Sequence, residues 1–152
     1  MHGSRRQGRA FALQLLYQFD IHDPLDEAAI ERFWAYQSAS ARARDFAMAL
    51  VLGVRAERAR IDAWLQGSME QWKLSRLSVV VRNILRLAAC ELLVLADVPH
   101  PVVINEAVEL AHRYMDEDSA HFVNSVLEKC WQAGQGGAPD TPPPPDAGGP
   151  PG

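Results

Sequence analysis

Apolar residues recur every three or four positions along most of the chain, which is the spacing of amphipathic helices. The first apolar stripe comprises Ala12, Leu15, Leu16 and Phe19. Upstream of it, Ser4 and Gln7 have the spacing of a capping box, which predicts a helix from Arg5 to about Asp20. No segment alternates apolar and polar residues for long, so strands are not expected.

Turn and capping residues divide the rest of the first half into two further helices. Asp23 and Pro24 predict the N-cap and the first residue of a helix that reaches about Ala39. Ser40 is then the expected cap of a long third helix, which Gly67 ends.

The second half carries the signals of three more long helices, after a short helical turn at 69–72. Their predicted N-terminal residues are Ser75 or Ser78 as a cap, Pro101 as a first residue, and Ser119 as a cap. Residues 97–99 stop the first of these helices, and the second ends at Tyr114. We therefore expect an all-α fold in which two three-helix subdomains, about 1–67 and 68–134, pack into one body.

The last part of the chain differs in composition from the rest. From Gly134 onward it reads GQGGAPDTPPPPDAGGPPG, without a large apolar residue. Such a segment buries too little apolar surface to offset the entropy of ordering it. A disordered Pro/Gly-rich tail is expected over 135–152, outside a helical domain at 1–134.

Composition and motifs exclude several classes of function. No apolar run approaches the roughly 18 residues that cross a bilayer, and the N-terminus is unlike a secretory signal. Cys90 and Cys130 are interpreted as buried thiols rather than a disulfide, which favours a cytoplasmic protein. Nucleotide-loop and zinc-protease motifs are missing, and no two histidines have ligand spacing. Glu106 and Glu109 fit a solvated carboxylate face better than an acid/base pair. We predict no catalytic residues, metal, cofactor or small-molecule substrate.

The arginines of the first predicted helix are its most unusual feature. The formal net charge is −4, yet Arg5, Arg6 and Arg9 stand near the start with no acid among the first ten residues. On a helix they span an arc of about 100°. Cations at a helix N-terminus cost roughly 0.3–1 kcal/mol each, whereas a phosphate ligand would offset that cost. The alternative is a frayed, solubilising basic end. Gln14 and Tyr17 follow on the same helix and suit single-stranded RNA, although core packing explains Tyr17 equally well.

Three longer segments carry a family pattern. They read SRRQGRAFALQLLYQFD, WKLSRLSVVVRNILRLAACELL and VPHPVVINEAVELAHRYMDEDSAHFVNSVLEK, and together they span residues 4–129. In this order they resemble the NusB family of transcription antitermination factors. The resemblance implies an all-α fold of two three-helix halves. It also implies binding of boxA-type single-stranded RNA, as a heterodimer with the ribosomal protein NusE, in the RNA polymerase antitermination complex that supports ribosomal-RNA transcription.

The resemblance also assigns roles to residues. The RNA contact of the family's first helix carries over to Arg5, Arg6 and Arg9. The partner surface lies largely in the C-terminal half of the family, and the candidates there are Arg82, Arg86, His121 and Phe122.

Several positions depart from the family pattern. They are Val81 in place of an acid, His112 in place of a lysine, Tyr114 and Met115 in place of Phe-Gly, and Ser125 in place of a glycine. Gly8 also lies inside a predicted helix, at a cost near 1 kcal/mol. One alternative is a NusB-like RNA-binding module of the kind attached to ribosomal-RNA cytosine methyltransferases, although no catalytic domain follows in this sequence. Another is a helical protein-interaction module without RNA contact or antitermination activity.

Overall fold

A computed structural model describes residues 2–21 and 26–137, and every regular element within them is helical. In chain order the elements are α1 (His2–Ile21), α2 (Glu27–Ala35), α3 (Ala41–Ala56), α4 (Arg58–Gln66), the 3₁₀ turn η1 (Leu74–Arg76), α5 (Val79–Cys90), the π-helical turn η2 (Glu91–Leu95), α6 (His100–Tyr114) and α7 (Glu117–Gly137). The all-α prediction is confirmed. The predicted helix start at Asp23 and Pro24 and the tail beyond 137 lie outside the described residues.

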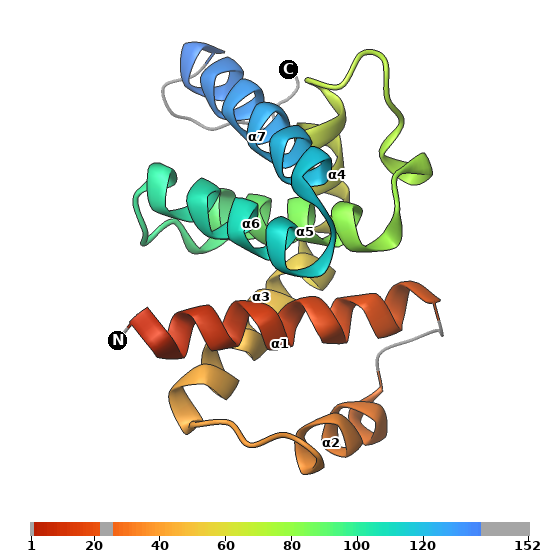
Figure 1. Cartoon of the computed structure of the whole chain (residues 1–152), viewed down its shortest axis with the longest axis vertical. Coiled ribbons are helices and arrows are strands. Elements are labelled where there is room, and N and C mark those ends of the chain that lie inside the picture. The colour runs from red at the N-terminus through yellow and green to blue at the C-terminus, as the bar shows by residue number, and fades with distance from the viewer. Residues whose placement is uncertain (1, 22–25, 138–152) are drawn as a thin grey trace.

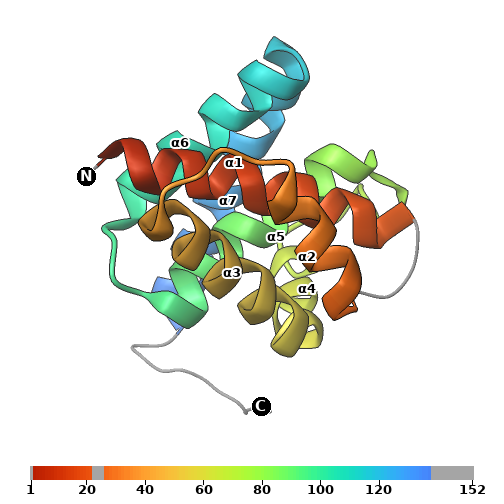
Figure 2. The same ribbon diagram turned by 90° about the horizontal axis from the view of Figure 1, so that it is seen from below.

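Helix α5 is the centre of the arrangement. It contacts α1 and α3 on one side and α4, α6 and α7 on the other. Helix α1 crosses the molecule with α5 and α6 above it and α2 below it (Figure 1). The view from below shows α2 and α3 covering the side of α1 that turns away from α6 and α7 (Figure 2). This central position explains why α5 is apolar nearly all round, with every residue from Asn83 to Cys90 buried.

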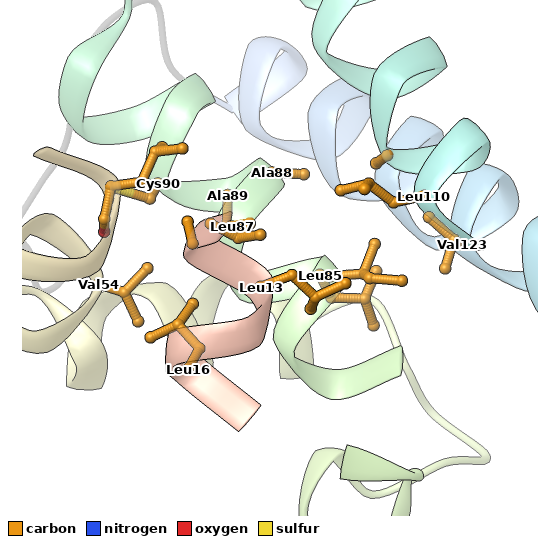
Figure 3. Close-up of a cluster of buried hydrophobic side chains, with 14 of the residues drawn as sticks. Leu13, Leu16, Val54, Leu85, Leu87, Ala88, Ala89, Cys90, Leu110 and Val123 are labelled. Carbon is orange, nitrogen blue, oxygen red and sulfur yellow. The ribbon is translucent and has the colours of Figure 1, made fainter. Parts of the chain in front are cut away.

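The hydrophobic core is shared by helices that lie far apart in sequence. Figure 3 shows Leu13 of α1, Val54 of α3 and Leu85 of α5 meeting in one cluster, which continues to Leu110 of α6 and Val123 of α7. Removing such side chains from water contributes about 1.5–3 kcal/mol for each large residue. Packing therefore fixes α1 against α5, and this fixes the direction in which the polar face of α1 points.

Two of the predicted caps are confirmed. The Ser40 hydroxyl accepts a hydrogen bond from the Ala43 amide at 3.1 Å, and the Ser78 hydroxyl accepts one from the Val81 amide at 3.2 Å. The capping box at Ser4 is wrong, because α1 already begins at His2. Helix α2 is capped by Asp26, whose carboxylate accepts from the Ala29 amide at 2.7 Å.

The predicted third helix is two helices. Helix α3 ends at Ala56 and α4 begins at Arg58, although Gly67 follows the last residue of the pair as predicted. The buried stripe of α3 ends at Val54, and the next positions on that side, Glu57 and Arg58, are charged. The break turns α4 toward α5 and α7, and the next buried positions, Ile61 and Leu65, belong to α4.

The last helix begins and ends differently from the prediction. Asp116, not Ser119, is the capping side chain, because its carboxylate accepts from the Ser119 amide at 2.7 Å. This hydrogen bond lowers the pKa of Asp116. At the other end α7 reaches Gly137. The expected turn at 69–72 is not helical, and a 3₁₀ turn follows it instead.

Candidate nucleic-acid interface on the first helix

The close approach of α1 to α3 depends on Gly8. A Cβ atom at this position would lie 2.9 Å from the carbonyl oxygen of Ala43 and 2.9 Å from Cδ2 of Phe46. The glycine that looked unfavourable in the sequence thus permits the two helices to touch. As a result the Phe46 ring lies 4.7 Å from the guanidinium of Arg5 and 5.3 Å from that of Arg9.

Arg9 is a buried structural residue. Its Nε donates to Oε1 of Glu91 at 2.7 Å and its Nη2 to Oε2 at 2.8 Å, and the two side chains are only 7% and 3% exposed. Glu91 is the first residue of the π-helical turn, so this bidentate pair joins α1 to the end of α5. The Arg9 side chain has almost no exposed surface in this structure, so its observed role is structural and its RNA contact stays a prediction.

Arg6 and Arg5 remain at the surface, each paired with a carboxylate. Arg6 donates from Nε and Nη2 to both carboxylate oxygens of Glu106, at 3.1 and 2.8 Å, while its own side chain stays 60% exposed. This hydrogen bonding and the charge of Glu106 raise the pKa of Arg6. Arg5 donates from Nη2 to Asp97 at 3.2 Å and is 41% exposed. The arginines therefore share one region, as predicted, but they are not a bare basic face.

The carboxylates beside these arginines were not predicted as site residues. Glu91, Asp97 and Glu106 come from η2, the loop after it and α6, which lie more than 80 residues from their arginine partners. Nothing local in the sequence signals such pairs.

The two polar residues further along α1 differ in exposure. Gln14 is partly buried, whereas Tyr17 is 42% exposed. Tyr17 therefore offers a ring face to solvent, and the core-packing interpretation of it is wrong. Both side chains belong to the same helix as Arg5 and Arg6, and at 100° per residue Tyr17 falls on the same side of α1 as Arg6.

The two arginines expected at a partner surface belong to an internal network. Arg86 is buried and donates from Nε and Nη2 to Asp62, at 2.9 and 3.1 Å, while Arg82 donates to Asp20 at 3.2 Å. Asn83 donates to the same Asp20 carboxylate at 2.9 Å. Burial alone would raise the pKa of Asp20, but the Asn83 hydrogen bond and the charges of Arg82 and Arg86 outweigh it and hold the pKa below its ordinary value. The network ties α1 to α4 and α5, and a partner contact through Arg86, which is buried here, stays a prediction.

The other two partner candidates lie at the start of α7. His121 is exposed, and the partly buried Phe122 ring packs edge-to-face against Trp72 with centroids 5.7 Å apart. Trp72 is 54% exposed and borders a hollow of about 350 Å³ that also reaches Ser125 and Lys129. Sequence reasoning missed Trp72, because it placed the residue in a helical turn and gave it no separate role.

Two features of the described residues concern metal binding and membrane insertion. No group of three or more His, Cys, Asp or Glu side chains in residues 2–21 and 26–137 is placed to hold a metal ion. None of the helices in that part of the chain is both long and apolar enough to span a bilayer. What the fold does offer is a rigid first helix whose outer side carries arginine, amide and tyrosine groups. These features define a small all-helical protein whose first helix exposes arginine and tyrosine side chains.

Comparison with known proteins identifies the family. The model of the NusB family matches residues 6–132, so this chain belongs to the NusB family. The transcription antitermination protein NusB of Anaeromyxobacter dehalogenans is 42% identical over 130 residues, which cover 85% of this chain and 91% of that protein.

Solved structures agree with this assignment. The structure of T. maritima NusB aligns with a TM-score of 0.75 at 35% identity, covering 84% of this chain and 90% of that one. A crystal structure of the antitermination factors NusB and NusE in complex with double-stranded RNA aligns with a TM-score of 0.79 at 27% identity. That alignment covers 88% of this chain and 99% of the solved chain.

Proposed function

We propose that this chain is a transcription antitermination factor that binds boxA-type single-stranded RNA as a heterodimer with the ribosomal protein NusE. In this role it joins the RNA polymerase antitermination complex and supports ribosomal-RNA transcription. The observation that carries the proposal is the family match over residues 6–132, together with a structural neighbour that was crystallised with NusE and RNA.

The exposed residues of α1 are assigned to RNA. Arg5 and Arg6 retain solvent-facing guanidinium surface and are the proposed phosphate contacts. Tyr17 is the proposed stacking partner for an unpaired base, and Gln14 the proposed amide contact. Arg9 is given a positioning role, because its buried pair with Glu91 holds α1 in place.

The NusE surface is assigned to the second half of the chain. His121 and Phe122 are retained as its candidate residues, and Trp72 is added because its exposed ring adjoins Phe122. We also propose that 1–67 and 68–134 form the two subdomains. The pairing of α1 with α3 and of α6 with α7, joined through α5, supports that division.

The chain is proposed to act by binding, without catalysis, metal or cofactor, in the cytoplasm. A second candidate function is a helical protein-interaction module that does not bind RNA. The observation in its favour is that every arginine at the start of α1 has a carboxylate partner within the molecule.

Fluorescence anisotropy of a labelled boxA-like single strand, with and without NusE protein, separates the two functions. The double variant Arg5→Ala/Arg6→Ala should bind RNA more weakly. Its plot of log K against log salt should also be shallower by about 1.4, since each lost phosphate contact on a single strand contributes about 0.7.

The matched control is Arg32→Ala/Arg55→Ala, which removes two exposed arginines from α2 and α3 with the same change in net charge. It should leave RNA affinity unchanged. Absence of RNA binding by the wild type, with NusE bound, would favour the protein-only module, whereas equal affinities for the wild type and the Arg5/Arg6 variant would show that the RNA site lies elsewhere.

A further inference from the structure

The surroundings of Arg5 and Arg6 carry as much negative as positive charge. The two hollows beside these residues are lined by four arginines, Arg5, Arg6, Arg9 and Arg113, and by three carboxylates, Asp97, Glu106 and Glu109. A fourth carboxylate, Glu91, pairs with Arg9. The formal charge of this region is therefore zero. An RNA phosphate that approaches it meets arginines whose charge is already compensated.

The two exposed ion pairs, Arg6–Glu106 and Arg5–Asp97, differ in burial and in the number of hydrogen bonds. Glu106 is only 14% exposed, accepts two hydrogen bonds from Arg6, and lies 3.8 Å from Nη1 of Arg9. Asp97 is 55% exposed and makes one hydrogen bond to Arg5 at 3.2 Å. Exposed single-contact ion pairs are weak, whereas bidentate and partly buried pairs are held more firmly. The Arg5–Asp97 pair is thus the one that an incoming anion can open.

The guanidinium of Arg5, in its position beside Asp97 and the Phe46 ring, also lacks a hydrogen-bond partner for one of its amino groups. Its Nη1 atom is buried and has no hydrogen-bond partner among the described residues, although Nη2 binds Asp97. A buried donor without an acceptor is unfavourable. Movement of Arg5 away from the Phe46 ring would let both amino groups reach an acceptor with several oxygens, such as a phosphate.

Asp97 is placed beside Arg5 by the backbone before α6. The π-helical turn ends at Leu95, its C-cap residue Ala96 has a φ of 53° in the left-handed region, and Asp97 follows directly. This turn and the Arg9–Glu91 pair fix the Asp97 backbone relative to α1.

We infer that Asp97 determines the RNA affinity of this protein by competing with a phosphate group for Arg5. This inference rests on the proposed function. RNA binding exchanges the carboxylate of Asp97 for a phosphate oxygen, while Glu106 keeps Arg6 oriented throughout. The carboxylate also repels the incoming strand until the exchange is complete.

The test is anisotropy with the boxA-like single strand on the full chain, in complex with NusE protein. Asp97→Asn removes the charge and keeps the shape of the side chain. It should tighten RNA binding by about three- to tenfold at low salt, as expected for removing one like charge at about 4 Å where water screens it as in bulk solvent, which is worth about 1 kcal/mol. The gain should shrink as salt rises, because screening acts over roughly 8 Å at physiological salt.

Glu31→Gln is the matched control. Glu31 is an exposed acid of α2, away from the α1 N-terminus in both views, and the substitution changes net charge by the same amount (Figures 1 and 2). It should not alter affinity. A double-mutant cycle gives a second criterion: in an Arg5→Ala background, Asp97→Asn should lose most of its effect.

The outcomes separate this inference from the proposed function. If Arg5→Ala/Arg6→Ala weakens RNA binding but Asp97→Asn leaves it unchanged or weakens it, competition by Asp97 is refuted and the RNA site stands. An equal gain in the Arg5→Ala background would also refute it, because Asp97 would then act only as a general negative charge. If the arginine variant binds RNA normally, the site itself is misplaced.

Discussion

Substitution of Gly8 by alanine tests the helix contact on which the arginine region is built. In an exposed helix interior this change stabilises the helix by about 0.8–1.0 kcal/mol. Here the new Cβ would lie 2.9 Å from both the Ala43 carbonyl oxygen and Cδ2 of Phe46. The carbonyl belongs to the backbone of α3, so relief requires the two helices to separate. Overpacking of this kind costs about 1–3 kcal/mol, so we expect a net loss of about 1 kcal/mol.

Urea denaturation followed by circular dichroism measures this loss directly. The midpoint should fall without a change in slope, since the amount of surface exposed on unfolding is the same. Gly3→Ala is the matched control. It lies in the same helix but would meet nothing within 4 Å, so it should be neutral or slightly stabilising. A Gly8→Ala protein as stable as the wild type, or more stable, would show that the close approach of α1 and α3 is not required.

Two further predictions concern the buried charges. Arg9→Met should lower the free energy of unfolding by about 3–5 kcal/mol, because it leaves Glu91 charged and buried, and adding Glu91→Leu should restore most of that loss. Urea denaturation of both variants checks this, and a double variant no more stable than the single one would contradict it. The second prediction concerns pH. Since the folded pKa of Asp20 is lowered, its contribution to stability is present above the unfolded value of about 4 and disappears as the pH falls through the folded value. Melting temperatures of Asp20→Asn should therefore depend less on pH below about 4 than those of the wild type; parallel curves would show that Asp20 has an ordinary pKa.

The sequence was a good guide to helices and a weaker guide to their ends. Apolar periodicity places each long helix, because burial of one face depends only on spacing. Ser40 and Ser78 are found as caps because a capping bond is made three residues away. The break at Glu57 and the early start of α1 depend instead on which other helices each turn meets. Local spacing contains no information about those contacts.

For the candidate site, too, the features that depend on local spacing were predicted, and the contacts between residues far apart in sequence were not. The position of Arg5, Arg6 and Arg9 on one helix follows from periodicity, and the exposure of Tyr17 is compatible with the expected RNA role. Their carboxylate partners lie 82 to 100 residues away in sequence, so no spacing rule finds them. The burial of Arg86 is hidden for the same reason, since Asp62 is on another helix.

The structure also changes the interpretation of the three arginines of α1. Since α1 begins at His2, only Arg5 lies close to its first turn, and the helix dipole acts strongly only there. The carboxylates from η2, its following loop and α6 compensate all three cations within the molecule. An arginine at this helix end is therefore not in itself a sign of a polyanion ligand. Exposure separates the roles instead: 7% for Arg9, against 41% and 60% for Arg5 and Arg6. The buried arginine anchors the helix, and that anchor holds the exposed ones where an RNA strand can reach them.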